Sequence, residues 1–326
     1  MNNRKFCVLF STKNHYSMFE DYLYKYSKAN WNDVLVLNVD IDSDEEEIKN
    51  GKEVCKKLGI HYVNKDNEVY ESNQNSVEAA DKYLIENKID VDWILFFQHD
   101  VVPMQKDFWR RLDTLLEKYD LSSKNVSMFG ANSHQNYRSC ETNNLSTTVR
   151  ESLTGRGNLE KNILKPPHSG WYKNLPESYY QEEYLVVESP NWQCVGFNRK
   201  LFREHITIDT IFRQDLWPDD IAHQFMLKGF INIAFTNLIV CHDHSLKKDV
   251  KIKVDNNFLR NKKSHDRFIE KYGWDWGKRN LLLRDQFKSA TQSWWDDKKT
   301  LYENSTQIKL FNMDINNGPK KIEDFE

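Results

Sequence analysis

The chain has 326 residues and a mass of 39.0 kDa, and 13% of its residues are aromatic. This aromatic content excludes a disordered chain and predicts a packed core in one large domain or two small ones. The 46 Lys and Arg residues nearly balance 49 Asp and Glu residues, for a formal net charge of -3, so the composition gives no footprint for binding nucleic acid or an anionic membrane.

The cysteines and the N-terminal apolar run bear on location. The 5 cysteines are scattered and form no CxxC pair, which predicts reduced, mostly buried thiols rather than a disulfide framework or a zinc site. The apolar run at residues 6–10 is too short for the core of a signal peptide or for a membrane span. We therefore expect a soluble, cytoplasmic protein without a transmembrane segment.

Short apolar runs alternate with helical patterns up to about residue 130. The runs lack the polar alternation of half-exposed strands, as expected for a sheet covered by helices on both faces. Strict alternation of strands and helices predicts βαβ units and therefore an α/β fold with a mainly parallel sheet. The expected strands lie at residues 6–10, 34–39, 60–63, 93–97 and 126–129.

The pattern changes in the second half of the chain. Periodicity fades between Ser133 and Glu183, where polar residues, Gly and Pro accumulate, and a segment this long favours a functional loop region or lid. Apolar signal returns at residues 184–187 and 192–197, and a helix at 219–228 precedes a long strand at 230–240. We expect one continuous domain followed by a C-terminal helical extension.

The residues that follow each expected strand are the candidates for chemistry, because ligands of open α/β sheets bind beyond the carboxyl ends of the strands. Polar and titratable side chains gather there. They are Ser11, Thr12 and Asn14 after the first strand, Asp40 and Asp42 after the second, Gln98, His99 and Asp100 after the fourth, and His242 and His244 after the last.

Each candidate has a plainer interpretation beside the functional one. Asp100 would hold a hard divalent cation at the mouth of a buried strand, or it closes a turn before Pro103. His242 and His244 point to one face of a strand end, which suits a metal ligand beside a phosphate contact, although ordinary core or surface histidines share this spacing.

Two adjacent acids open the expected helix at 219–228. One of them is explained as an N-cap or a first-turn acid favoured by the helix dipole. A second acid, beside Trp217, also suits a catalytic base. Asp219 and Asp220 are therefore both candidates for acid–base chemistry.

The order of these features resembles that of the inverting family 2 glycosyltransferases, which have the GT-A fold. Residues 5–14 (KFCVLFSTKN) stand where that family has an opening strand such as VSVIIPTYN. Asp40 matches the Asp that ends the family's second strand and contacts the nucleotide base. Residues 96–103 (FFQHDVVP) match FLDADVVP, with Asp100 at the metal-binding last acid and Gln98 at the first.

Further motifs follow in the same order, and the resemblance covers Lys5 to Trp274. Residues 194–202 (CVGFNRKLF) are similar to the family's acceptor segment, and Pro218 to Asp220 resemble the start of the helix that bears its catalytic base. Residues 241–245 (CHDHS) are similar to the strand end that bears its metal-binding His, and residues 267–274 (RFIEKYGW) to its RFxxKW pattern.

The resemblance implies a nucleotide-sugar-dependent glycosyltransferase of the hexosyltransferase type, with a GT-A (Rossmann-like) fold. It would move a sugar from a nucleoside-diphosphate sugar to a hydroxyl of a glycan or glycoconjugate acceptor with inversion, as in polysaccharide biosynthesis. The implied catalytic domain is 1–245, with a nucleotide-binding half at about 1–132 and an acceptor-binding half at 133–245. Residues 246–326 would form the helical extension and tail.

The resemblance also implies the roles of individual residues. A divalent cation, Mn²⁺ or Mg²⁺, held by Asp100 and His242 would neutralise the departing diphosphate. Asp220, or alternatively Asp219, would act as the general base on the acceptor hydroxyl. The implied contacts to the nucleotide sugar are Ser11, Thr12, Asn14, Asp40, Asp42, Gln98, His99 and His244, and those to the acceptor are Trp192 and Trp217.

Two other functions remain open from the sequence. Because Gln98 replaces one acid of the metal motif, the chain is alternatively a degenerate GT-A domain that binds nucleotide or glycan without turnover. A metal-dependent hydrolase would use the same histidines and Asp100, but it needs more ligands than any HxxEH or CxxC array here supplies.

Overall fold

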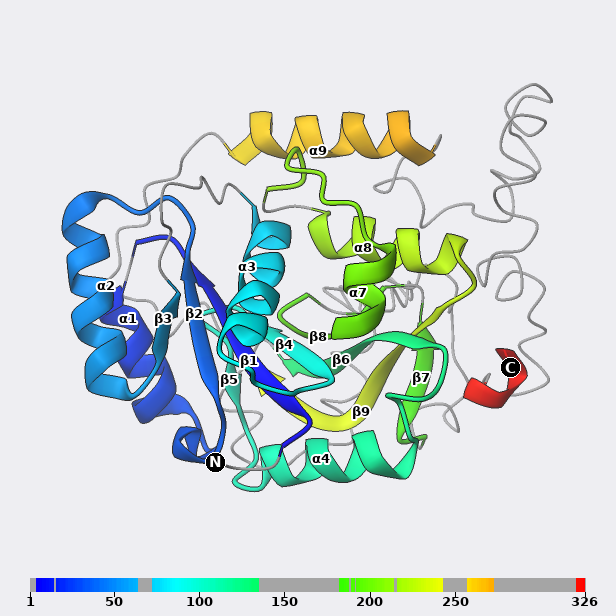
Figure 1. Cartoon of the computed structure of the whole chain (residues 1–326), viewed down its shortest axis with the longest axis horizontal. Helices are drawn as coiled ribbons and strands as arrows, with labels where there is room; N and C mark the ends of the chain where they lie inside the picture. Colours follow the sequence, from blue (N-terminus) through cyan, green and yellow to red (C-terminus); the bar gives the residue numbers. More distant parts are fainter. Residues whose placement is uncertain are drawn as a thin grey trace, which may run out of the picture.

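The computed structural model describes residues 4–14, 16–63, 72–134, 182–187, 189–190, 192–213, 216–242, 257–272 and 321–325. In this part of the chain nine strands form one sheet, which helices cover on both faces (Figure 1). The strand order is β3-β2-β1-β4-β8-β6-β9-β5, and β7 pairs separately with β9. The architecture is therefore the predicted α/β fold.

The first half of the sheet is parallel, as the alternation of strands and helices predicts. Strand β1 runs parallel to β2 and β4, and β2 runs parallel to β3. Burial explains the unbroken apolar runs, because every residue of β1, β2 and β4 is buried. The bounds are Phe6–Thr12 for β1, Val36–Asp40 for β2, His61–Val63 for β3 and Trp93–Phe97 for β4.

The second half of the sheet is mixed, so the sheet is less parallel than predicted. Strand β8 lies antiparallel between β4 and β6, β9 is parallel to β6, and the short β5 and β7 are antiparallel to β9. Antiparallel pairing does not need a helical crossover, so the alternation that revealed the first half is absent here. The bounds are Val102–Pro103 for β5, Val126–His134 for β6, Tyr184–Val187 for β7, Cys194–Asn198 for β8 and Ile231–Cys241 for β9.

Helices cover the two faces in separate groups. Side chains of α1, α2 and α4 pack with Phe6, Val8 and Phe10 on one face of β1, whereas α3, α8 and α9 pack with Cys7 and Leu9 on the other. The bounds are Tyr16–Glu20 for α1, which continues as a π-helical turn over Asp21–Tyr26, Glu45–Leu58 for α2, Asn73–Glu86 for α3, Phe108–Lys118 for α4, Arg199–His205 for α7, Trp217–Leu227 for α8 and Asn257–Tyr272 for α9. The sequence analysis missed α7 and β5, which are short.

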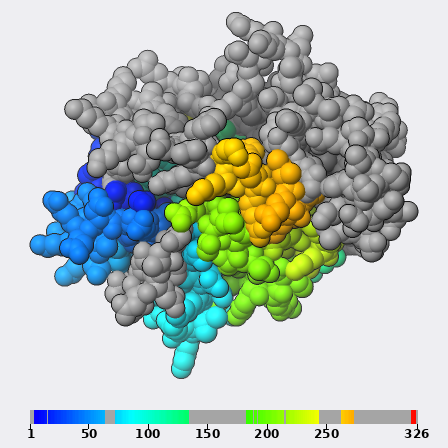
Figure 2. All heavy atoms as spheres, turned by 90° about the horizontal axis from the view of Figure 1, so that it is seen from above, coloured from blue at the N-terminus to red at the C-terminus, as the bar shows by residue number. Residues whose placement is uncertain are grey.

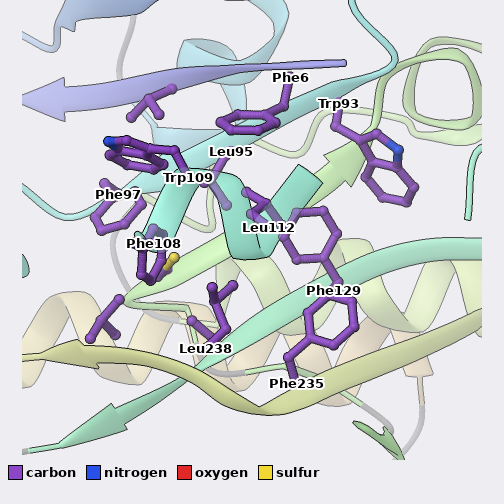
Figure 3. Close-up of a cluster of buried hydrophobic side chains, with 14 of the residues drawn as sticks. Phe6, Trp93, Leu95, Phe97, Phe108, Trp109, Leu112, Phe129, Phe235 and Leu238 are labelled. Atoms are coloured by element: carbon purple, nitrogen blue, oxygen red, sulfur yellow. The ribbon is translucent and has the colours of Figure 1, made fainter. Parts of the chain in front are cut away.

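Aromatic residues dominate the core between α4 and the sheet (Figure 3). The ring centroids of Phe108 and Trp109 on α4 lie 4.9 Å apart, and that of Trp109 lies 6.0 Å from the centroid of Phe97 on β4. Phe129 fills the space above Gly196, where an added Cβ would lie 2.2 Å from the phenyl ring. These aromatic side chains thus pack the core, as the high aromatic content of the sequence predicts.

Two described pieces of the predicted C-terminal extension pack on this domain. Phe268 and Tyr272 of α9 belong to the same core cluster as α3 and α8. Figure 2 shows α9 lying against the green segment that contains α7 and α8. Ile322 is buried, and its backbone N–H donates to the Tyr184 hydroxyl on β7 at 3.2 Å.

Four cysteines lie in the described ranges, and all four are buried free thiols. This agrees with the prediction of reduced, buried thiols, while Cys140 lies outside those ranges. Among the helices that the structure describes, none combines the length and apolar character needed to span a bilayer.

Candidate active site

The sheet topology brings residues from distant parts of the sequence to one edge. Strands β1, β2 and β4 are parallel and end at this edge. Strand β8 is antiparallel to β4, with Cys194 opposite Phe97, so β8 begins there. The parallel strands β6 and β9 also end together, with His134 opposite Cys241.

Asp100 and His242 meet at this edge. The Nε2 atom of His242 lies 3.1 Å from Oδ2 of Asp100, and both side chains are buried. On the other side of the imidazole, Nδ1 contacts the amide nitrogen of Gln193, and the Gln193 amide oxygen accepts a hydrogen bond from the Ser133 hydroxyl. The structure therefore brings together the two residues that the sequence analysis assigned to a metal.

The donor set around Asp100 fits a divalent cation that phosphate oxygens also bind. One carboxylate and one imidazole can each supply a ligand. Within the described ranges no cluster of three or more His, Cys, Asp or Glu residues occurs. Gln98 lies two residues before Asp100, and its buried Oε1 has no hydrogen-bond partner among the described residues.

The turn after β4 carries these groups in a fixed shape. The backbone N–H of Val101 donates to the Gln98 carbonyl at 3.0 Å, and the N–H of Gln98 donates to the Gln193 carbonyl at 3.1 Å. His99 lies half-buried at the tip of this turn. Backbone pairing therefore joins the turn of Asp100 directly to the segment that leads into β8.

Two loops are clasped together where β1 and β2 end. The Asn14 side-chain oxygen accepts from the Asp44 N–H at 3.0 Å, and the Asn14 N–H donates to the Ser43 hydroxyl at 2.7 Å. Asn14 and Asp42 both have left-handed backbone, with φ of 56° and 70°. Asp42 is exposed and pairs with Lys13 at 2.9 Å. Asp42 and Lys13 thus form an ion pair at the surface of the clasp.

The other predicted donor-site residues on these strands are buried and bonded within the chain. The Ser11 hydroxyl lies 2.7 Å from that of Ser76 on α3, and the Thr12 hydroxyl donates to the Asn38 amide oxygen at 2.7 Å. These bonds tie the end of β1 to α3 and to β2.

Asp40 is 2% exposed and has both oxygens occupied. The Tyr16 hydroxyl donates to Oδ2 at 2.6 Å, and the Ser43 N–H donates to Oδ1 at 3.0 Å. Burial, together with the neighbouring Asp40 carboxylate, raises the pKa of Tyr16 far above its usual value. Asp40 therefore joins Tyr16 and Ser43 by hydrogen bonds at the base of the clasp.

Asp220 lies in a network that joins α3, α8 and α9. Its side chain is 0% exposed. Oδ1 accepts from the Lys271 ammonium at 2.6 Å and the Tyr272 hydroxyl at 2.7 Å, and Oδ2 accepts from the Gln74 amide at 3.0 Å and the Gln224 amide at 2.8 Å. Burial raises the pKa of Asp220, and the Lys271 ammonium and the other donors oppose this. Four donors thus surround the carboxylate.

Asp219 occupies the first turn of α8 next to this network. Successive residues of an α-helix are rotated by about 100°, so Asp219 lies on a different face of α8 from Asp220, and it is also buried. It shares a helical face with Ala222 and Met226, and α8 packs against β9 and β6. The Asn232 amide of β9 donates to the Ala222 carbonyl at 3.4 Å, so this stretch of α8 lies against β9.

The two tryptophans proposed for the acceptor differ in position. The Trp217 ring is fully buried, with its centroid 4.7 Å from that of Phe96 and 5.8 Å from that of Phe197. It is a core residue of α8 facing the sheet, which corrects the expectation that it contacts a sugar. Trp192 is half-buried immediately before β8, at the site edge. His244 lies outside the described residues.

The sequence analysis missed Gln193, Ser133, Gln74 and Lys271. Gln193 precedes β8, and because β8 is antiparallel to β4 its first residues, rather than those that follow it, lie at the site edge. Lys271 lies in a motif that the resemblance pointed out, but nothing in the sequence indicates that it contacts Asp220, which is 51 residues away.

Comparisons with known protein families and with curated protein sequences find no match. Solved structures do match over nearly the whole chain. GalNAc-T7, solved with UDP, GalNAc and Mn²⁺, is 11% identical with a TM-score of 0.51, over 95% of this chain and 57% of that chain.

Two further structures match with lower TM-scores. The mannosyltransferase PcManGT from Pyrobaculum calidifontis, in complex with GDP-Man and Mn²⁺, is 10% identical with a TM-score of 0.45, over 95% of this chain and 87% of that chain. S. aureus TarS 1-349 is 10% identical with a TM-score of 0.44, over 93% and 82%. The likeness to GalNAc-T7 shows a glycosyltransferase fold of the GT-A type and confirms the predicted fold class. This chain spans little more than half of GalNAc-T7.

Proposed function

We propose that this protein is a nucleotide-sugar-dependent glycosyltransferase that moves a hexosyl group to a hydroxyl of a glycan or glycoconjugate acceptor with inversion. The observation that carries the proposal is the buried pair of Asp100 and His242, 142 residues apart in the chain, at the carboxyl edge of a GT-A-type sheet. Ligands of open α/β sheets bind at this edge, which supports a donor site here.

The pair of Asp100 and His242 would hold Mn²⁺ or Mg²⁺. A bound cation neutralises the negative charge that develops on a departing diphosphate. The chain would bring its own ligands from the turn after β4 and from the end of β9, and the buried oxygen of Gln98 offers a further acceptor for a ligand or its water. Gln98 stands at the position of the first acid of the metal motif, and its side chain keeps a polar oxygen there.

The general base in this proposal is Asp219 rather than Asp220. Inversion needs one base on the side of the sugar opposite the leaving group, to take the proton from the attacking hydroxyl. Both oxygens of Asp220 already accept from two donors each, so the carboxylate has no side left for an acceptor hydroxyl. Asp219 starts the same helix on a different face, and the Asp220 network holds that helix in place.

The clasp between the ends of β1 and β2 would bind the nucleoside. Its backbone is fixed by the bonds of Asn14 to Ser43 and Asp44, while Lys13 and Asp42 remain at its surface. A nucleoside presents ring and ribose groups that both donate and accept hydrogen bonds. The Lys13 ammonium can donate to such groups, and the Asp42 carboxylate can accept from them. UDP with Mn²⁺ is the first combination to test, since GalNAc-T7 was solved with both.

Donor hydrolysis and transfer by the purified protein test this function. We expect turnover of one nucleoside-diphosphate sugar with Mn²⁺ and none with EDTA. Asp219→Asn is expected to lower turnover by about 10²- to 10⁴-fold, the range for loss of a general base, while donor binding is retained. Donor binding that persists without turnover under all conditions would instead favour the degenerate domain, a possibility that Gln98 raises.

A further inference from the structure

Four buried side chains form one hydrogen-bonded row at the candidate metal site. The row runs from the Ser133 hydroxyl through the Gln193 amide and the His242 imidazole to the Asp100 carboxylate. Each of the four residues is at most 5% exposed. The row crosses from β6 through the segment before β8 to the end of β9 and the turn after β4.

The position of the proton on the His242 imidazole decides which ring nitrogen can donate a hydrogen bond and which can bind a cation. A neutral imidazole has one N–H and one bare nitrogen. With the Gln193 amide nitrogen donating to Nδ1, the proton must lie on Nε2, which then donates to Asp100. A cation needs the lone pair of Nε2, so the proton must then lie on Nδ1 and requires an acceptor there.

The Gln193 side chain can serve both arrangements. An amide has a donor at one corner and an acceptor at the other, and half a turn about its last bond exchanges them. The Ser133 hydroxyl on the far side donates or accepts with equal ease, so it follows the amide in either orientation. No buried polar group of the row is left unpaired in either arrangement.

We infer that Gln193 is a positioning residue that selects the tautomer of His242, with its amide nitrogen toward Nδ1 when His242 donates to Asp100 and its amide oxygen toward Nδ1 when Nε2 binds a cation. This inference rests on the proposed metal-assisted function and adds a residue to it. Gln193 also fixes the second ligand, because its carbonyl accepts from the Gln98 N–H at the turn that bears Asp100.

Mn²⁺ binding in the presence of UDP, GDP or dTDP, followed by electron paramagnetic resonance of free Mn²⁺, tests this inference on the full chain. Gln193→Met keeps the length of the side chain and removes both polar corners, and we expect about tenfold or more weaker Mn²⁺ binding, as for loss of an outer-shell partner. Gln193→Glu keeps an acceptor toward Nδ1, so its affinity should be at least that of the wild type.

Gln105→Met is the matched control. The Gln105 amide also bonds β9, donating to the Asn237 carbonyl at 2.9 Å and accepting from the Ile239 N–H at 3.0 Å, but it does not touch His242. It should lower the melting temperature about as much as Gln193→Met and leave Mn²⁺ affinity unchanged. A purely structural role for Gln193 would make the two variants alike in both measurements.

The tautomer itself is visible in the metal-free protein by ¹⁵N NMR of labelled histidine, with His242→Gln identifying the signal. We expect the proton on Nε2 in the wild type and on Nδ1 in Gln193→Glu. Mn²⁺ binding that is equal in the wild type and Gln193→Met, or a tautomer that is the same in the wild type and Gln193→Glu, would overturn the inference alone. A wild-type protein that binds no Mn²⁺ with any of the three nucleotides would overturn the proposed metal-assisted function as well.

Discussion

Asp220→Asn separates a structural carboxylate from a catalytic one. In the folded protein Oδ1 faces Lys271 and Tyr272, and Oδ2 faces the amide nitrogens of Gln74 and Gln224. An Asn side chain keeps one acceptor oxygen and places a donor NH₂ at the other position. With the NH₂ toward Gln74 and Gln224, two amide donors lose their acceptor. With the NH₂ toward Lys271 and Tyr272, the Lys271 ammonium loses its acceptor, whereas the Tyr272 hydroxyl still donates to the Asp220 carbonyl at 3.2 Å.

The surrounding amides cannot adapt by rotating. The Gln224 amide is held by the Thr207 backbone, donating to its carbonyl at 3.1 Å and accepting from its N–H at 2.9 Å. The Gln74 amide oxygen accepts from the Asp209 N–H at 2.7 Å. Leaving a buried donor unpaired costs about 1–3 kcal/mol, so the loss of one or two acceptors predicts a fall of roughly 1–6 kcal/mol in the free energy of unfolding.

Urea unfolding followed by tryptophan fluorescence measures this loss. Asp219→Asn is the comparison at the neighbouring carboxylate, which is also buried, and we expect it to lower the free energy of unfolding by less than Asp220→Asn does, since it leaves the four-donor network intact. An Asp220→Asn protein that is as stable as the wild type, binds donor and fails only in transfer would refute our reasoning, and would return the base role to Asp220.

Three further predictions address the pH dependence, the packing and the cation. Burial and the nearby Lys271 ammonium lower the pKa of His223 to about 3, so the folded state keeps His223 neutral while the unfolded chain takes up a proton below its ordinary value. The free energy of unfolding is therefore unaffected by His223 above about pH 6.5 and falls as the pH drops toward 3, with a loss of about 2 kcal/mol at pH 5. In urea titrations at different pH values, His223→Gln should lack this loss. Gly196→Ala places a methyl group against the buried Phe129 ring and should cost about 1–3 kcal/mol in the same titrations, whereas an unchanged free energy of unfolding would show that the ring yields without cost. Asp100→Asn should weaken Mn²⁺ binding in the presence of UDP while leaving the melting temperature of the metal-free protein within a few degrees, and equal Mn²⁺ affinity would remove Asp100 from the cation site.

The sequence predicts most of the parallel half of the sheet because its strands are buried on both faces. Continuous apolar runs identify the bounds of β4 to the residue and those of β1 and β2 within two residues, and the polar residues after them do lie at one edge. The antiparallel strands β7 and β8 are also visible as apolar runs, whereas the two-residue β5 is not. The direction of β7 and β8 is not visible, because it depends on partners far away in the chain.

The candidate site was predictable only as far as its residues follow strands. Asp100 and His242 do, and they lie together. Gln193 precedes its strand, and the burial of Asp220 depends on Lys271 and Tyr272 from a helix that begins after residue 256. No local pattern shows whether an acid at a helix start faces solvent, a substrate or another helix.

Thermal melting of the protein with UDP, GDP or dTDP, each in Mn²⁺, Mg²⁺ or EDTA, tests the central claim most directly. A ligand at 100 times its dissociation constant stabilises the folded state by about 2.7 kcal/mol, which a melting curve detects. We predict that one nucleotide raises the melting temperature with a divalent cation and that EDTA abolishes the rise, in the wild type and not in Asp100→Asn. No rise with any nucleotide and cation would contradict the proposed glycosyltransferase.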